Sequence, residues 1–392
     1  MDRLKDTLKK DLVSSILAGI FLASTTPFLG VIARRYFSAS PLHISLISVA
    51  SGVGQLFTFY WGYIIRSRKD KLKMYVIPNI IARGVFLFTP IIYSIGSFLF
   101  IIFLYQIISC MATPAYVEVV KAMYPDMLRG RIMGLVKMVN NLVVIAVTPL
   151  SGQAISSIGF RWVFFVSGIA GIISSLIFSR IKIRETHREN TVPISIKTIL
   201  TIPFLDKRFG TYLSVFFMYG LGNWLSNPIY PIILVDKLQA STLQVGYIST
   251  ITSILSAIFY IYWGRYIDKR DPVRVLFLVF SLDFMIPLGY LLSSIKPTLI
   301  FVFISAGISG IVNAGVDLAV MNTILMLAPK EEIASYMALH STFVGIRGII
   351  GPFLGASLYP VIGPIGIFSI NIATALSGGF LMYRFCNSLT TT

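Results

Sequence analysis

Long apolar runs alternate with short polar segments over the whole chain, and the polar segments hold most of its charge. A helix that rises about 1.5 Å per residue needs about 20 apolar residues to cross the hydrocarbon core of a bilayer. Twelve runs reach this length. We predict transmembrane helices over residues 13–35, 43–65, 74–94, 97–120, 132–155, 160–180, 211–235, 242–264, 274–294, 298–327, 335–358 and 361–384.

These runs are too long and too continuous for the strands of a membrane barrel. Inside a bilayer every backbone polar group must be bonded internally, so only helices or closed barrels can cross it. The chain is therefore predicted to be an all-α membrane protein. A longer polar stretch, residues 181–210, is predicted to link an N-terminal six-helix bundle (1–180) to a C-terminal six-helix bundle (211–392).

The composition agrees with a lipid environment, because 56% of the 392 residues are hydrophobic and only 12% are charged. Soluble domains carry about 25% charged residues. A net charge of +17 would suggest nucleic acid as the partner of a soluble protein. Here the basic residues gather between the apolar runs, and we expect no nucleic-acid binding. The first apolar run, residues 12–32, is too long for the core of a cleaved signal peptide.

The distribution of Lys and Arg predicts the orientation of the chain in the membrane. Of the 33 basic residues, 25 lie in the two terminal segments and in the connections on the same side as the termini. Only five lie on the opposite side, and three (Arg83, Lys137 and Arg347) lie inside predicted spans. Because basic residues are retained on the inner side, both termini and the linker 181–210 are predicted to be cytoplasmic in a multi-pass protein of the cell membrane.

The two halves of the chain repeat one another at a shift near 201 residues. Residues 39–48 (ASPLHISLIS) match residues 240–249 (ASTLQVGYIS) at five of ten positions. At the same shift Pro27 aligns with Pro228, and Gly19 aligns with Gly220. A parallel repeat of two six-helix halves is a known construction of transporters, with the solute site near the midplane.

The segment GRYIDKRDPVR at residues 264–274, between the eighth and ninth predicted spans, resembles the signature loop of the major facilitator superfamily. That signature reads Gly-x-x-x-Asp-(Arg/Lys)-x-Gly-x-(Arg/Lys). Gly264 would permit close helix approach, Asp268 would cap a neighbouring helix N-terminus, and basic residues up to Arg274 would hold the carboxylate and the membrane face. In the N-terminal copy of this loop, Arg66 stands where the family has the acid.

Residues 125–134 (PDMLRGRIMG) look like the Pro-x-x-x-Arg-Gly-x-x-x-Gly turn of the same family, and the resemblance covers nearly the whole chain. It implies twelve transmembrane helices in two pseudo-symmetric six-helix bundles, with spans 1, 4, 7 and 10 lining a cavity. The span-4 motif of the family's proton-driven exporters includes an Arg, whereas Gln106 stands near that place here. That motif therefore does not support proton-coupled drug export.

Polar residues recur at helical spacing in three of these four spans. Asn313 and Asp317 share one face of span 10, and span 7 carries a longer polar stripe. The predicted solute-binding residues are Thr25, Thr26, Gln106, Thr113, Asn223, Trp224, Asn227, Tyr230 and Asn313. The alternative is that these side chains only bond to neighbouring helices.

Six ionisable residues lie well inside predicted spans: Arg83, Glu118, Lys137, Asp283, Asp317 and Arg347. Such residues are costly in hydrocarbon, so they should pair or line a water-filled cavity. Matching depths predict two pairs, Asp317 with Arg347 and Glu118 with Lys137. Asp283 could join the first pair, and the sequence offers Arg83 no partner. Either the pairs are static, or a carboxylate titrates during transport.

We therefore predict a secondary transporter that moves a small organic solute by alternating access, with energy from an ion gradient or from the solute itself, and protons as a candidate coupling ion. An aromatic and amide-rich cavity suits an uncharged or amphipathic solute. The rival hypothesis is a lipid or lipid-linked flippase on the same scaffold. The sequence carries no Gly-x-x-x-x-Gly-Lys-(Ser/Thr) loop, catalytic triad or histidine spacing typical of a metal site. We expect no enzyme activity, cofactor or metal, and a monomer.

Overall fold

A computed structural model of the chain describes residues 2–66, 70–183, 196–269, 271–329 and 332–390. All regular secondary structure in these ranges is helical. The chain divides into two compact units. Unit 1 comprises Met1–Ser38, Val53–Pro193 and Ser241–Thr250, and unit 2 comprises Ala39–Gly52, Ile194–Ala240 and Ile251–Thr392.

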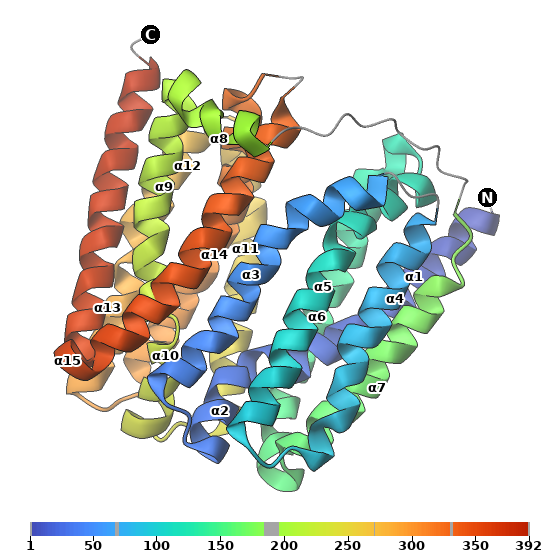
Figure 1. The fold of residues 1–392 in the computed structure, drawn as a ribbon, viewed down its shortest axis with the longest axis horizontal. Helices are drawn as coiled ribbons and strands as arrows, with labels where there is room; N and C mark the ends of the chain where they lie inside the picture. Colours follow the sequence, from blue (N-terminus) through green and yellow to red (C-terminus); the bar gives the residue numbers. More distant parts are fainter. Residues whose placement is uncertain (1, 67–69, 184–195, 270, 330–331, 391–392) are drawn as a thin grey trace. The chain divides into compact units, whose positions relative to one another are not determined.

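Unit 1 is a bundle in which α1 packs against α6 and α7, while α4 packs against α5 and α7. Figure 1 shows its ribbons in the blue to green part of the colour range. Its elements are α1 (Asp2–Thr25), the 3-10 helix η1 (Thr26–Phe28), α2 (Leu29–Phe37), part of α3 (Pro41–Arg66), α4 (Lys71–Gly84), the 3-10 helix η2 (Val85–Ile91), α5 (Ile95–Met123), α6 (Asp126–Ile158) and α7 (Phe160–Ser179).

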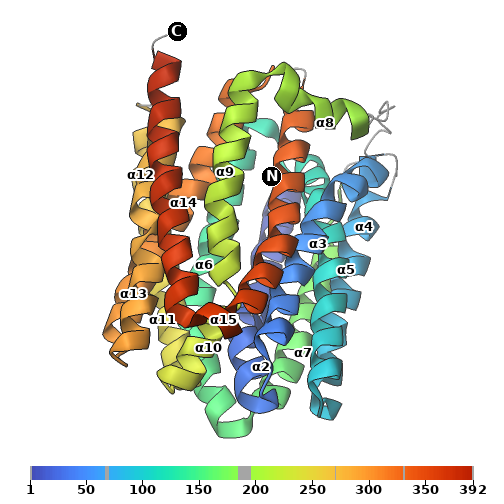
Figure 2. The same ribbon diagram turned by 60° about the vertical axis from the view of Figure 1, so that its left-hand side comes forward.

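Unit 2 is a bundle in which α9 and α15 make the largest contact, and α12 packs against α14 and α15. Figure 2 shows α9 between the N-terminal and the C-terminal part of α15 in that view. Its elements are α8 (Ile196–Leu205), α9 (Lys207–Ser226), α10 (Ile229–Ile232), the π-helix η3 (Ile233–Lys237), most of α11 (Thr242–Ile267), α12 (Pro272–Asp283), α13 (Met285–Ile295), α14 (Ile300–Leu327) and α15 (Ile333–Thr390).

Prolines at repeat-related positions break the first span of each half. In unit 1, α1 ends at Thr25 and Pro27 lies in η1. In unit 2, α9 ends at Ser226 and Pro228 separates it from α10. Proline lacks the backbone N–H and its ring clashes with the carbonyl four residues earlier, which interrupts a helix. Both breaks therefore have a proline at the same position of the repeat.

The ninth predicted span is also broken, next to a buried acidic residue. Its two parts, α12 and α13, meet at Phe284, directly after Asp283. Pro287 explains the break, because it has no N–H to donate to the carbonyl of Asp283. In unit 1 the third span changes from α4 to η2 after Gly84, one residue beyond Arg83. Each half therefore interrupts its third helix beside an ionisable residue.

Each of the twelve predicted spans coincides with described helix. The last two form one element, α15, which is interrupted at Gly363, where φ is 64°. Among the described residues, nine helical segments are long and apolar enough to cross a membrane, and the one over Ser335–Leu389 covers both of these spans. The predicted linker contains a helix that the sequence did not predict, α8, which packs on α9 and α15.

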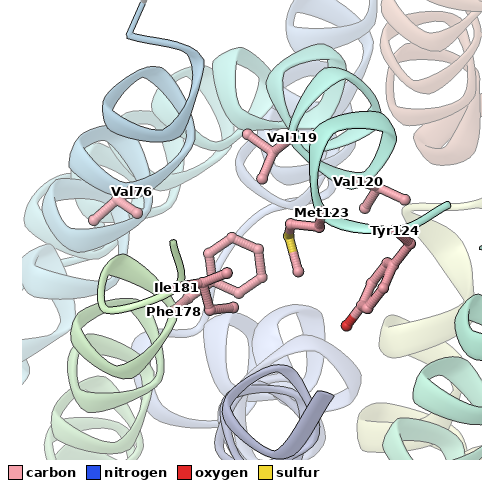
Figure 3. Close-up of a cluster of buried hydrophobic side chains, with 7 residues drawn as sticks. All are labelled: Val76, Val119, Val120, Met123, Tyr124, Phe178 and Ile181. Atoms are coloured by element: carbon pink, nitrogen blue, oxygen red, sulfur yellow. The ribbon is translucent and has the colours of Figure 1, made fainter. Parts of the chain in front are cut away.

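A cluster of buried apolar side chains closes the end of unit 1 where α4 begins and α5 and α7 end (Figure 3). Its members are Val76, Val119, Val120, Met123, Tyr124, Phe178 and Ile181. The Tyr124 hydroxyl donates a hydrogen bond of 2.7 Å to Asp11, which is 2% exposed. Burial and the nearby Asp11 raise the pKa of Tyr124 above its usual value, so the hydroxyl stays a proton donor.

Candidate functional site

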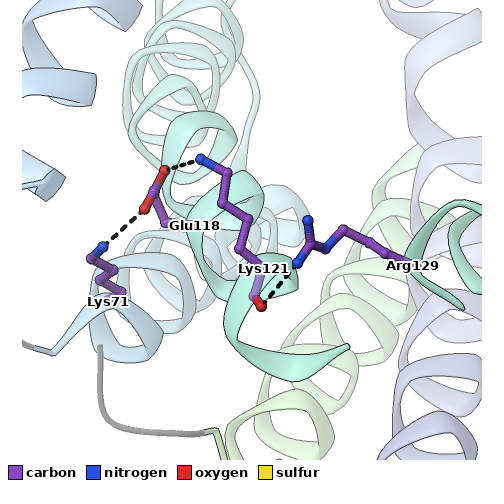
Figure 4. Close-up of polar contacts among 4 residues, drawn as sticks. All are labelled: Lys71, Glu118, Lys121 and Arg129. Carbon is purple, nitrogen blue, oxygen red and sulfur yellow. Dashed lines mark hydrogen bonds and ion pairs between the residues drawn. The ribbon is translucent and has the colours of Figure 1, made fainter. Parts of the chain in front are cut away.

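Glu118 lies in a closed ion cluster of unit 1 rather than in an open site. Its carboxylate accepts from Lys71 at 2.8 Å and from Lys121 at 3.0 Å (Figure 4). The side chains of Lys71 and Glu118 are only 4% and 10% exposed. Arg129 donates to the backbone carbonyl of Lys121 at 3.3 Å. The two ammonium groups stabilise the ionised carboxylate and outweigh the cost of its burial.

The predicted pair of Glu118 with Lys137 is wrong. Lys137 is exposed on α6, and it makes no ion pair with a carboxylate of the described residues of unit 1. Depth along a helix does not fix the rotation of that helix about its axis, and the rotation of α6 leaves Lys137 exposed. Glu118 pairs instead with Lys71. Lys71 begins α4, but in the sequence it stands among the basic residues of a predicted connection.

Replacing Lys71 by Met is expected to lower the free energy of unfolding by about 3 kcal/mol, because it leaves a buried carboxylate with one exposed partner. Denaturant titration in detergent micelles measures this change. Adding Glu118→Gln should restore part of the loss. The matched control is Lys73→Met, since Lys73 and its partner Asp70 are each 70% exposed. That change should cost less than about 0.5 kcal/mol, and equal losses in both variants would contradict a buried pair.

Arg83 has neutral partners on a neighbouring helix. Its guanidinium donates to the Gly171 carbonyl at 2.9 Å and to the Ser175 hydroxyl at 3.0 Å. A side chain at Gly171 would collide with Arg83, because the nearest Arg83 atom would lie 2.8 Å from its Cβ. The Phe21 ring lies 5.8 Å from the guanidinium carbon. These contacts tie α4 to α7, which favours a structural role for Arg83.

The predicted polar residues of unit 1 differ in their surroundings. Thr25 is 1% exposed and its hydroxyl donates to the Phe21 carbonyl at 2.8 Å. Thr25 is therefore buried within the bundle with its hydroxyl already bonded, and it is not accessible to a solute. Gln106 is half-buried, whereas Thr26 and Thr113 are exposed.

Asp283 lies at the centre of the polar cluster of unit 2. It is 3% exposed and accepts a hydrogen bond of 2.9 Å from the amide of Asn223, one of the predicted residues. The hydroxyl groups of Tyr219 and Tyr230 lie near its carboxylate. Tyr219 stacks on Phe280 with ring centroids 3.6 Å apart. All of these neighbours are neutral.

Other members of the span-7 stripe also find partners in unit 2. Asn371 donates to the Tyr230 hydroxyl at 3.3 Å. Asn227 is exposed and accepts from the Ser48 hydroxyl at 2.6 Å. Trp224 is half-buried and packs on Gly351, where an added Cβ would lie 2.6 Å from the Trp224 Cβ.

The predicted pair of Asp317 with Arg347 is wrong. Asp317 is exposed on α14 and accepts a hydrogen bond from the Tyr260 hydroxyl of α11 at 2.5 Å. Arg347 is 7% exposed and donates to the Phe216 carbonyl at 2.6 Å. Asp283 and Arg347 form no ion pair with each other either, although Tyr219 interacts with both. Similar depths along α14 and α15 did not bring the two side chains to the same face.

The stripe on α14 is confirmed as one face of a helix. Asn313 donates to the Ser309 hydroxyl at 3.2 Å, and both Asn313 and Asp317 are exposed. The Asp317 carboxylate lies about 15 Å and the Asn313 amide about 20 Å inside the span, at a rise of about 1.5 Å per residue. Exposed polar groups at such depths are costly in hydrocarbon and belong in contact with water. The same reasoning applies to Thr113 and Lys137 of unit 1.

Comparison with known proteins decides what kind of molecule carries these polar faces. The sequence model of the Major Facilitator Superfamily matches residues 12–210 and 212–389. The chain belongs to the major facilitator superfamily. It is 21% identical over 297 residues to the uncharacterized MFS-type transporter MJ1560 of Methanocaldococcus jannaschii, and the match covers 74% of this chain and 75% of that protein.

Solved structures of this superfamily show the same fold. A point variant of the nucleoside transporter NupG superposes with a TM-score of 0.80 at 12% identity and covers 97% of this chain and 99% of its own. A bacterial homologue of the human lysosomal transporter Spinster gives a TM-score of 0.63 at 14% identity, with coverage of 98% and 95%. At these identities the likeness shows the fold alone.

The facilitator fold confirms twelve transmembrane helices in two pseudo-symmetric six-helix bundles. The chain is accordingly a multi-pass membrane protein and a secondary transporter, and it is not an enzyme. Its partners are a small-molecule solute and the lipid bilayer.

In the signature loop, residues 264–274, Gly264 and Asp268 do not have the roles that the family motif implies. A side chain at Gly264 would meet none of the described residues within 4 Å, so close packing against them does not require this glycine. Asp268 is exposed, and the residue that caps α12 is Asp271, whose carboxylate accepts from the Val273 N–H at 2.8 Å. Arg274 lies beside the thiol of Cys386 on α15. The expected role of Asp268 therefore falls to Asp271 in this loop.

Cysteines placed at Thr113 and Asn313 are expected to react with a membrane-impermeant charged thiol reagent in proteoliposomes, because both positions are exposed polar sites. The background carries Cys110→Ser and Cys386→Ser; both native cysteines are buried. The control is Leu142→Cys, since Leu142 is 57% exposed but apolar. Lipid should shield it from the reagent. Equal labelling at all three positions would contradict water-lined polar faces.

Proposed function

We propose that this transporter moves a small uncharged or amphipathic organic solute by alternating access and couples it to protons through Asp283. The observation that carries the proposal is a carboxyl group 3% exposed whose neighbours are Asn223, Tyr219 and Tyr230. An ionised carboxylate buried without a cation is far more costly than its neutral acid. Such a group binds a proton when it is enclosed and releases it when water or a cation reaches it.

The polar groups named around Asp283 come from three elements of unit 2. Tyr219 and Asn223 come from α9, Tyr230 comes from α10, and Asn371 of α15 bonds to Tyr230. The charge of Arg347 acts on Tyr219, the tyrosine that also interacts with Asp283. Because the helix is broken directly after Asp283, a small rearrangement at the break can change the exposure of this carboxyl group.

Two other carboxylates are less suited to carry the proton. Glu118 is held between two ammonium groups, which keep it ionised. Asp317 is exposed and bonds to Tyr260. We propose that Asp317, Asn313, Asn227, Thr113 and Thr26 contact the solute, because they are polar and accessible within their spans.

The charge distribution supports an orientation with both termini and the linker 181–210 in the cytoplasm. The internal repeat, with its shift near 201 residues, supports bundles over residues 1–180 and 211–392. We propose that one chain is the working unit, since the family's repeat supplies both halves of the fold.

A ligand screen tests the proposed function. Purified protein is mixed with a panel of uncharged and amphipathic solutes, and the thermal unfolding midpoint is followed. Solutes that raise it are then tested by counterflow in proteoliposomes. We expect at least one solute to exchange across the membrane and no acceleration of fluorescent phospholipid flip. Phospholipid movement without solute exchange would favour the flippase and overturn the proposal.

A further inference from the structure

Arg347 is a buried cation of unit 2 for which the described residues supply no carboxylate. Its guanidinium donates to the Phe216 carbonyl at 2.6 Å and lies 4.2 Å from the centroid of the Phe216 ring. Its Nε is buried and has no hydrogen-bond partner among the described residues. Gly220 leaves room for it, since a Cβ there would lie within 2.1 Å of the guanidinium carbon.

Two further polar groups without partners surround the same phenylalanine. The His340 ring lies 4.6 Å from the Phe216 ring, and its Nε2 is buried without a hydrogen-bond partner in the described part of the chain. The Tyr212 ring lies 5.9 Å from Phe216 and stacks on His340 at 6.1 Å, and its hydroxyl is likewise unpaired. Arg347, His340 and Tyr212 are 7%, 9% and 0% exposed.

The Arg347 N–H and the Tyr212 hydroxyl are buried donors that need an acceptor, and Arg347 carries a charge. His340 Nε2 donates as well in one tautomer of its neutral ring. Unpaired buried polar groups are rare in native proteins, and a buried cation without a counter-charge is strongly destabilising. The nearby carboxylates are engaged elsewhere: Asp283 accepts from Asn223, and Asp206 accepts from Tyr336 at 3.0 Å. The surroundings of Arg347 therefore favour a negative ligand that is not a residue of this unit.

We propose that unit 2 binds a small inorganic anion of the chloride type, held by Arg347 Nε, the Tyr212 hydroxyl and His340 Nε2. The low exposure of all three side chains leaves no access for an organic solute. The bound anion neutralises the guanidinium and fastens α9, which carries Tyr212 and Phe216, to α15, which carries His340 and Arg347. This site is separate from the proposed proton carrier and does not depend on the solute.

The test uses the thermal unfolding midpoint of the purified full-length protein in detergent, with sodium chloride exchanged for sodium gluconate at constant ionic strength. We expect chloride to raise the midpoint by several degrees in a saturable manner, as ligand linkage requires. Arg347→Gln should abolish the dependence. Tyr212→Phe removes one donor to an anion and should raise the half-saturating chloride concentration about tenfold.

Arg83→Gln is the matched control, because Arg83 is also an intramembrane arginine but already has carbonyl and hydroxyl partners. It should retain the chloride dependence of the wild type. If Arg347→Gln does not fold, the shift in Tyr212→Phe decides the question. A wild-type midpoint that does not depend on chloride, or an unchanged dependence in Tyr212→Phe, would overturn the proposal. Neither result bears on transport through Asp283.

Discussion

Asp283→Asn is expected to abolish solute accumulation driven by a proton gradient while solute counterflow continues. Asn has nearly the same shape as Asp and can still accept a hydrogen bond from Asn223, but it cannot take up or release a proton. Uptake against a gradient should fall to the level of protein-free liposomes. Counterflow needs only solute binding and the change of conformation, so it should persist. Both are measured with the solute identified in the screen.

The control for this change is Asp70→Asn, which alters an exposed carboxylate that pairs with the exposed Lys73. It should accumulate solute as the wild type does. Asp317→Asn is expected to change the apparent affinity for the solute, because Asp317 lies on the accessible stripe of α14. Full accumulation in Asp283→Asn would refute proton coupling through this residue, and loss of counterflow as well would assign it to solute binding.

Gly355→Ala is expected to destabilise unit 2 by about 3 kcal/mol or more, because it forces apart the two helices with the largest mutual contact. A Cβ at Gly355 would lie 1.9 Å from the carbonyl oxygen of Leu225 on α9. That atom is backbone, so it cannot rotate away as the end of a side chain can. The free energy of unfolding in detergent micelles and the yield of folded protein both report the effect.

Gly134→Ala provides the comparison, since Gly134 lies inside α6 and its Cβ would meet no atom within 4 Å in the described part of the chain. Replacing an uncrowded helical glycine by alanine should stabilise the protein by about 0.5–1 kcal/mol. Opposite signs for the two substitutions would confirm that α9 and α15 meet at backbone distance. A stable Gly355→Ala variant would show that this close approach is not required.

The fold was predictable because its main signals are local. Apolar length predicted the spans, and the repeat predicted two equivalent halves. Pro27 and Pro228 break their helices at matching positions, as the repeat requires. The helix α8 was missed because the apolar residues of 196–205 form a run too short for a span and stand within a polar linker.

The side-chain pairs were not predictable, because they depend on how each helix is rotated about its axis. Depth placed Lys137 level with Glu118 and Arg347 level with Asp317, yet neither pair forms. The polar stripes were more predictable than the pairs. Residues at helical spacing share one face of their own helix, however that helix is rotated, as Asn313 shares a face with Ser309. Lys71 and Asp11 are buried partners of Glu118 and Tyr124, but in the sequence they stand among charged residues next to the membrane.

The most direct test of Asp283 as the proton carrier is infrared spectroscopy of the purified protein at neutral pH, in the carbonyl region of protonated carboxyl groups. We predict a band in the wild type that disappears in Asp283→Asn and remains in Asp70→Asn. Addition of the transported solute should change its intensity in the wild type. A spectrum of Asp283→Asn that keeps the full wild-type band would contradict a proton on this residue.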